Sequence, residues 1–173
     1  MIVGVDPSVS AFGLALPGGE LLTIKARAGA AEPARRLHEL ERLFEQTLRH
    51  HPPRPELVLI EGYSHNPKGI MSAFRLAELG GVVRLRLFEL GIPYLEIQPA
   101  SLKRYATGNG NANKDRMIDA ARALGATPAD HDQADAFLLR HLGRAAYGLE
   151  PIFAPHAAEI VAAFTWPSLP AAA

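Results

Sequence analysis

The 173-residue sequence contains no cysteine, which excludes disulfide bonds, thiolate zinc sites and cysteine nucleophiles. No apolar run approaches the roughly 18 residues that a membrane-spanning helix needs. The first ten residues, MIVGVDPSVS, carry no basic flank before their apolar stretch, unlike a secretory signal. We therefore expect a cytoplasmic protein without a membrane partner, and the length suits one compact domain.

The sequence also has no net charge, since 18 basic residues balance 18 acidic ones. Taken alone, this balance argues weakly against a nucleic-acid partner, which usually selects a basic excess. The charge is unevenly distributed, however. Residues 62–122 hold nine Lys or Arg against five acids, a net charge of +4, so the remainder sums to −4. This pattern is compatible with a basic surface around an acidic centre.

Hydrophobic periodicity predicts alternating strands and helices. We predict strands at 2–6, 10–17, 20–28, 56–63 and 92–97, and helices at 32–50, 69–90, 99–106, 114–124 and 130–146. The fold class is therefore α/β, with a mixed five-stranded sheet of three antiparallel and then parallel strands, flanked by helices. We expect this domain to span 1–148, and the proline-bearing segment 149–173 to be an irregular tail that ends in disorder.

Four acids in these elements suggest a shared site. Asp6 ends the first strand, Glu61 ends the very apolar run LVLIE, and Asp132 and Asp135 lie three residues apart on the last predicted helix. If the first and fourth strands are neighbours, Asp6 and Glu61 meet at one edge of the sheet. Four close carboxylates repel unless a cation neutralises them, and Mg²⁺ or Mn²⁺ is suited to oxygen ligands of this kind. Two such ions about 4 Å apart can promote phosphodiester hydrolysis.

Each acid also has a purely structural interpretation. Asp6 precedes a proline and suits a turn, and Asp132 suits the first turn of a helix, where the dipole favours an acid. Glu61 and Asp135 have less structural reason to stand among apolar residues, because a buried acid is costly without a partner. The combination favours a metal site over four independent structural roles.

The segments IVGVDPSVSAFGLAL, VLIEGY and HDQADAFLL resemble the RuvC family of Holliday-junction resolvases, within the RNase H-like fold. The resemblance covers roughly residues 1–145 in element order. Ser8 stands where the family usually has glycine, and Asp132 where some members have histidine. The resemblance implies a divalent-metal-dependent endonuclease that resolves branched DNA, with Asp6, Glu61, Asp132 and Asp135 as catalytic metal ligands. It also implies a homodimer, because a four-way junction needs two symmetric nicks.

The same resemblance identifies candidate contacts to DNA. Lys103 and Lys114 match lysines that the family places near the cut strand, although Lys103 suits a solvated surface equally well. Ser64 stands where some members carry an aromatic residue at the junction, Tyr63 is adjacent to it, and Lys68 lies in the same loop. His65 and His131 can lie near the acids. Gly80 and Gly81, inside a helix, are compatible with core packing and with a subunit contact.

The sequence is also compatible with other functions. A related nuclease for RNA or flap substrates would share the acids and differ only in its binding surface. A catalytically inactive relative that binds branched DNA should have lost an acid, and none is missing. An ATP-binding domain of the actin and sugar-kinase type also begins with a similar hairpin, but it needs a second domain and more glycine-rich phosphate loops.

Overall fold

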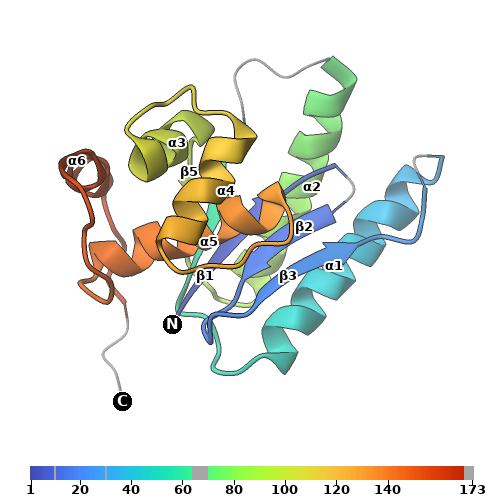
Figure 1. The fold of residues 1–173 in the computed structure, drawn as a ribbon. Helices are drawn as coiled ribbons and strands as arrows, with labels where there is room; N and C mark the ends of the chain where they lie inside the picture. Colours follow the sequence, from blue (N-terminus) through green and yellow to red (C-terminus); the bar gives the residue numbers. More distant parts are fainter. Residues whose placement is uncertain (10, 30, 64–69, 170–173) are drawn as a thin grey trace.

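The computed structural model describes residues 1–9, 11–29, 31–63 and 70–169, whose arrangement is shown in Figure 1. The strands are β1 (Ile2–Pro7), β2 (Ala11–Ala15), β3 (Leu21–Lys25), β4 (Leu57–Glu61) and β5 (Tyr94–Ile97). The helices are α1 (Pro33–His50), α2 (Ile70–Glu89), α3 (Pro99–Thr107), α4 (Lys114–Ala123), α5 (His131–Ala146) and α6 (Pro155–Ala162). Within these described ranges, no helix combines the length and apolar character needed to cross a membrane.

The five strands form one mixed sheet in the order β3-β2-β1-β4-β5. Strand β1 pairs antiparallel with β2 and parallel with β4, while β2 pairs antiparallel with β3 and β4 parallel with β5. Three antiparallel strands are thus followed by parallel ones, as the sequence predicts. The first and fourth strands are neighbours, so the condition on which the predicted site depends is met.

The sheet separates two hydrophobic cores. Helices α1 and α2 cover one face, and α5 lies on the other with α3, α4 and α6 beside it (Figure 1). Side chains alternate between the faces along a strand, so β1 contributes Ile2 to the α5 side and Val3 and Val5 to the α1–α2 side. By the same alternation, Asp6 and Glu61 both belong to the face that α5 covers.

Two strand glycines allow α5 to lie directly on the backbone of the sheet. A Cβ atom at Gly4 would stand 1.9 Å from the carbonyl oxygen of Ala136, and one at Gly13 would stand 2.1 Å from that of Asp132. Such distances are possible only for glycine, which has no side chain to displace the helix. Gly13 pairs with Asp6 across β1 and β2, so the close approach occurs beside the predicted site.

The segment after residue 148 differs from the predicted irregular tail, because it contains α6. Pro155 occupies the first turn of that helix, where its missing N–H breaks no hydrogen bond, and the following alanines favour helix. Ala157 and Ile160 are buried in the α5-side core, and the indole of Trp166 donates to the carbonyl of Val161 at 2.8 Å. The predicted disordered end, at 170–173, lies outside the described residues. The domain boundary at residue 148 stays a prediction.

Candidate metal centre

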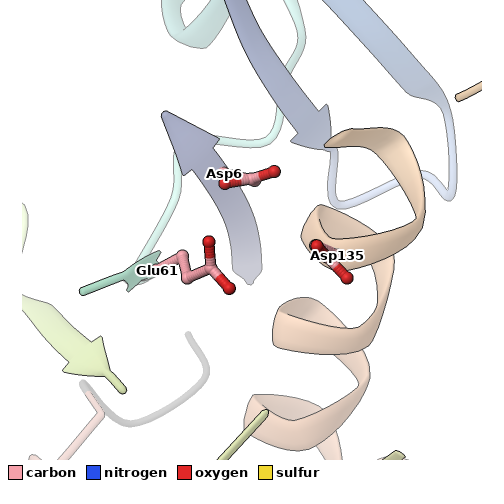
Figure 2. A group of neighbouring side chains, drawn as sticks. All are labelled: Asp6, Glu61 and Asp135. Carbon is pink, nitrogen blue, oxygen red and sulfur yellow. The ribbon is translucent and has the colours of Figure 1, made fainter. Parts of the chain in front are cut away.

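The parallel pairing of β1 and β4 brings two acids together at their carboxyl ends. Val5 is in register with Ile60, so Asp6 and Glu61 occupy the next positions of adjacent strands. Asp6 is almost fully buried, with only 5% of its surface exposed. Both side chains project towards α5 (Figure 2). The prediction that these acids meet at one edge of the sheet is confirmed.

Helix α5 contributes the third acid, Asp135. One ligand oxygen from each of Asp6, Glu61 and Asp135 lies within 4.8 Å of the others, and the three side chains converge between the strand ends and the helix (Figure 2). The fourth candidate, Asp132, is not part of this mutually close group. Its Oδ1 atom lies 3.0 Å from His131 Nε2, one turn nearer the start of α5.

Burial and mutual repulsion disfavour the ionised form of these carboxyl groups. Burial raises the pKa of Asp6 well above its usual value, and the charges of Glu61, Asp135 and Asp132 raise it further. Burial also raises the pKa of Glu61, while its hydrogen bond with Asp6 and the charge of Lys103 oppose that rise. The pKa of Asp135 is raised to about 8, first by burial and then by the charge of Glu61. The site therefore attracts positive charge.

The donor set fits a hard divalent cation. All three close groups offer carboxylate oxygens, the ligands that Mg²⁺ and Mn²⁺ prefer. No group within the described part of the chain forms a hydrogen bond with the buried Oδ1 atom of Asp135, and such an atom is costly unless something else satisfies it. A cation held by Asp6, Glu61 and Asp135 would satisfy this oxygen and relieve the repulsion that raises the pKa values.

The predicted DNA contacts take different positions. Lys103 and Lys114 lie close enough to the acids that both lower the pKa of Glu61, against the larger effect of burial. Tyr63 instead packs against α2, where its hydroxyl donates to the carbonyl of Ala77 at 3.3 Å. The guanidinium carbon of Arg84 lies 5.2 Å from the centroid of its ring. Gly80 makes room for that hydroxyl. Ser64, His65 and Lys68 lie outside the described residues.

Several residues that hold the site were not singled out from the sequence. Asp130 caps α5 by accepting from the backbone N–H of Gln133 at 2.9 Å, and it also accepts from the hydroxyl of Thr23 on β3 at 2.9 Å. Gln133 in turn donates to Thr23 at 3.0 Å. The spacing of Asp130 and Gln133 is that of a capping box, so a sequence signal for this anchor existed. The contact of Asp130 with Thr23, which is 107 residues away, had no such sequence signal.

The raised pKa values predict how the stability of the cation-free protein depends on pH. The stability linked to the protonated carboxyl of Asp135 is fully present below the ordinary pKa of 3.8 and is lost as pH rises through about 8. In EDTA, the melting temperature should therefore fall between about pH 5 and pH 8, as measured by scanning fluorimetry. Asp135→Asn should flatten this slope, and so should saturating Mg²⁺. A wild-type melting temperature that rises over this window would contradict the prediction.

Comparisons with known proteins point to one family. The sequence model described as crossover junction endodeoxyribonuclease RuvC matches residues 2–140. The protein of that name from Rhodococcus jostii is 32% identical over 151 residues, covering 80% of this chain and 77% of the relative. That from Anaeromyxobacter dehalogenans is 39% identical over 90 residues, covering 50% and 49%, so the chain matches about half of the length of this relative.

Solved structures agree with the fold. A structure described as Thermus thermophilus RuvC in complex with Holliday junction substrate matches with a TM-score of 0.66 at 25% identity, covering 86% of this chain and 96% of that one. A structure of RuvC from the same organism gives a TM-score of 0.63 at 24% identity. The predicted RNase H-like fold is thereby confirmed.

Proposed function

Because this chain belongs to the RuvC family of crossover junction endodeoxyribonucleases, we propose that it is a divalent-metal-dependent endonuclease that resolves four-way DNA junctions. The observation that carries the proposal is the convergence of Asp6, Glu61 and Asp135, from three separate elements, on one point. These three residues offer carboxylate oxygens and no thiol or hydroxyl group. The site can act by holding cations and a water beside a phosphodiester.

Asp6, Glu61 and Asp135 would hold the first cation, and Asp132 would contribute to a second. Bound there, Mg²⁺ or Mn²⁺ would activate the attacking water and neutralise the charge that develops on the leaving oxygen. Lys103 on α3 and Lys114 at the start of α4 place positive charge beside the same acids, which suits contact with the phosphates of the cut strand. Roles for Tyr63, Ser64 and Lys68 in DNA binding, and a cytoplasmic location, stay predictions.

The test is cleavage of a labelled four-way junction beside a linear duplex, a DNA flap and an RNA–DNA hybrid, with Mg²⁺, Mn²⁺ or EDTA. We expect paired nicks on the junction that require a divalent cation. Cleavage of the flap or the hybrid alone would support the metal site but show that the proposed substrate is wrong. Binding of the junction without cleavage in the presence of any metal would overturn the proposed activity. It would favour the alternative of a catalytically inactive protein that binds branched DNA.

We also propose a homodimer formed through α2. Among the described residues of this helix, three large apolar side chains are strongly exposed: Phe74 (58%), Leu85 (58%) and Phe88 (79%). Their spacing places them on one side of the helix, together with Gly81, whose missing Cβ leaves open space. An apolar stripe of this kind fits a second copy of the same helix, and Gly81 would let two helices approach closely.

Leu85→Glu combined with Phe88→Glu should convert the dimer to a monomer in light scattering coupled to gel filtration. Burying two charges in place of two apolar side chains should raise the dimer dissociation constant by about 100-fold or more. Leu149→Glu, at a side chain that is 50% exposed beyond α5, is the matched control and should leave the dimer intact. A double variant that remains dimeric at micromolar concentration would exclude this surface.

A further inference from the structure

One polar contact beside the acids belongs to none of the roles described above. His131 is the first residue of α5, and its Nε2 atom lies 2.6 Å from Lys114 Nζ and 3.0 Å from Asp132 Oδ1. The imidazole thus stands between a lysine of α4 and a carboxylate of α5. It lies at the surface with 39% of its side chain exposed, whereas the Asp132 side chain is only 13% exposed.

The contact joins residues of two helices that stand 17 positions apart in the sequence. A lysine ammonium has three donors and no acceptor, so a ring nitrogen at 2.6 Å is a partner that can accept from Lys114. Asp132 Oδ1 lies 3.0 Å from the same nitrogen, so the contact stands directly beside a candidate cation ligand.

Lys114 gains a restraint from this contact. It is the first residue of α4, where the positive end of the helix dipole disfavours a cation. Its flexible side chain also loses conformational freedom when it is held in one place. The charge of Lys114 nevertheless reaches the cluster, because it lowers the pKa of Glu61 and Asp135 against the larger effect of burial. His131 supplies the contact that holds this charge beside the acids.

We infer that His131 is a positioning residue, which fixes the ammonium group of Lys114 beside the acids, where the scissile phosphate would lie. The inference rests on the proposed nuclease function for its catalytic consequence. Its structural basis is the 2.6 Å contact between Lys114 of α4 and His131 of α5. His131 itself needs to touch neither the cation nor the substrate.

Activity measurements separate this role from a general structural one. His131→Ala should lower kcat about tenfold, with little change in KM for the junction, because the lysine charge is then no longer held in place. His131→Gln should retain most of the activity that His131→Ala loses, since the amide oxygen of glutamine can accept from Lys114 while its NH₂ group faces solvent. The variant lacking both side chains, His131→Ala with Lys114→Ala, should be no less active than Lys114→Ala alone. Independent, multiplicative losses in that pair would overturn the proposal, and so would wild-type kcat in His131→Ala.

A second measurement tests the contact without any activity. In ¹H–¹⁵N spectra that select lysine ammonium groups, the Lys114 signal should be visible in the wild type, because a held ammonium exchanges its protons slowly, and it should be lost in His131→Ala. A Lys114 signal that is equally visible in His131→Ala, or absent in the wild type, would overturn the proposal even if the enzyme is active. Failure of the wild type to cut any substrate would instead sink the proposed function, while the spectrum still decides the contact.

Discussion

Asp6→Asn is expected to abolish junction cleavage while the protein still binds the junction. Asp6 is one of the three mutually close acids and is the most buried of them. The amide of asparagine removes one negative charge and one ligand oxygen, so cations bind weakly. Loss of several kcal/mol of transition-state stabilisation corresponds to a decrease in kcat on the order of 10³-fold or more. Single-turnover cleavage of a labelled junction measures the loss, and gel retardation in Ca²⁺ or EDTA measures the binding.

The same substitution should stabilise the protein when no cation is present. Burial first, and then the charges of Glu61, Asp135 and Asp132, raise the pKa of Asp6, so its ionised form is disfavoured in the folded state. A neutral amide relieves this repulsion, and we expect the melting temperature in EDTA at pH 8 to rise by roughly 3–8 °C. Asp119→Asn is the matched control, because that side chain is 74% exposed and should change neither activity nor stability. A more active or a less stable Asp6→Asn variant would contradict this account.

Among substitutions that add a single methyl group to this sheet, Gly4→Ala should destabilise the protein most. The new Cβ would lie 1.9 Å from the carbonyl oxygen of Ala136 and 2.7 Å from the backbone nitrogen of Arg140. Both atoms belong to the backbone of α5, so no side-chain rotation can relieve the clash. The helix must move away from β1 or the strand must distort, at a cost of about 3–5 kcal/mol.

Urea unfolding measures the change in the free energy of unfolding, and the affinity for Mn²⁺ provides a second readout. Because α5 carries Asp135 and Asp132, its displacement should weaken metal binding even in molecules that remain folded. Gly18→Ala is the control, since its added Cβ meets no atom of the residues that the structure describes within 4 Å. Equal stability of the Gly4 and Gly18 variants would show that α5 does not depend on the close approach.

The strands and the pair Asp6 and Glu61 could be predicted because they depend on local signals. Each acid ends an apolar run, and strand order follows from a chain whose hairpin precedes a helical crossover. The position of Asp132 could not be predicted in the same way. A spacing of three puts Asp132 and Asp135 on one side of a helix, but only the angle of α5 on the sheet decides which of them approaches Asp6 most closely.

Other features depended on contacts that no local pattern records. The contact of His131 with Lys114 joins two helices whose relative position follows from the whole α5-side core. The close approach at Gly4 had a sequence signal, because a glycine inside a strand often marks the approach of another backbone. The prolines of residues 149–173 predict an irregular chain and not the helix α6, yet Pro155 is well suited to the first turn of that helix.

The sheet stands between the acids and the exposed stripe of α2, and this separation bears on how two subunits would share work. Asp6, Glu61 and Asp135 face α5, whereas the buried side of α2 packs on the opposite face of the sheet. In the proposed dimer, a partner docked on α2 would therefore complete no part of the acidic group, and each subunit would carry its own three acids. The two incisions proposed for one junction would then be chemically independent events, coordinated only through the geometry of the bound DNA.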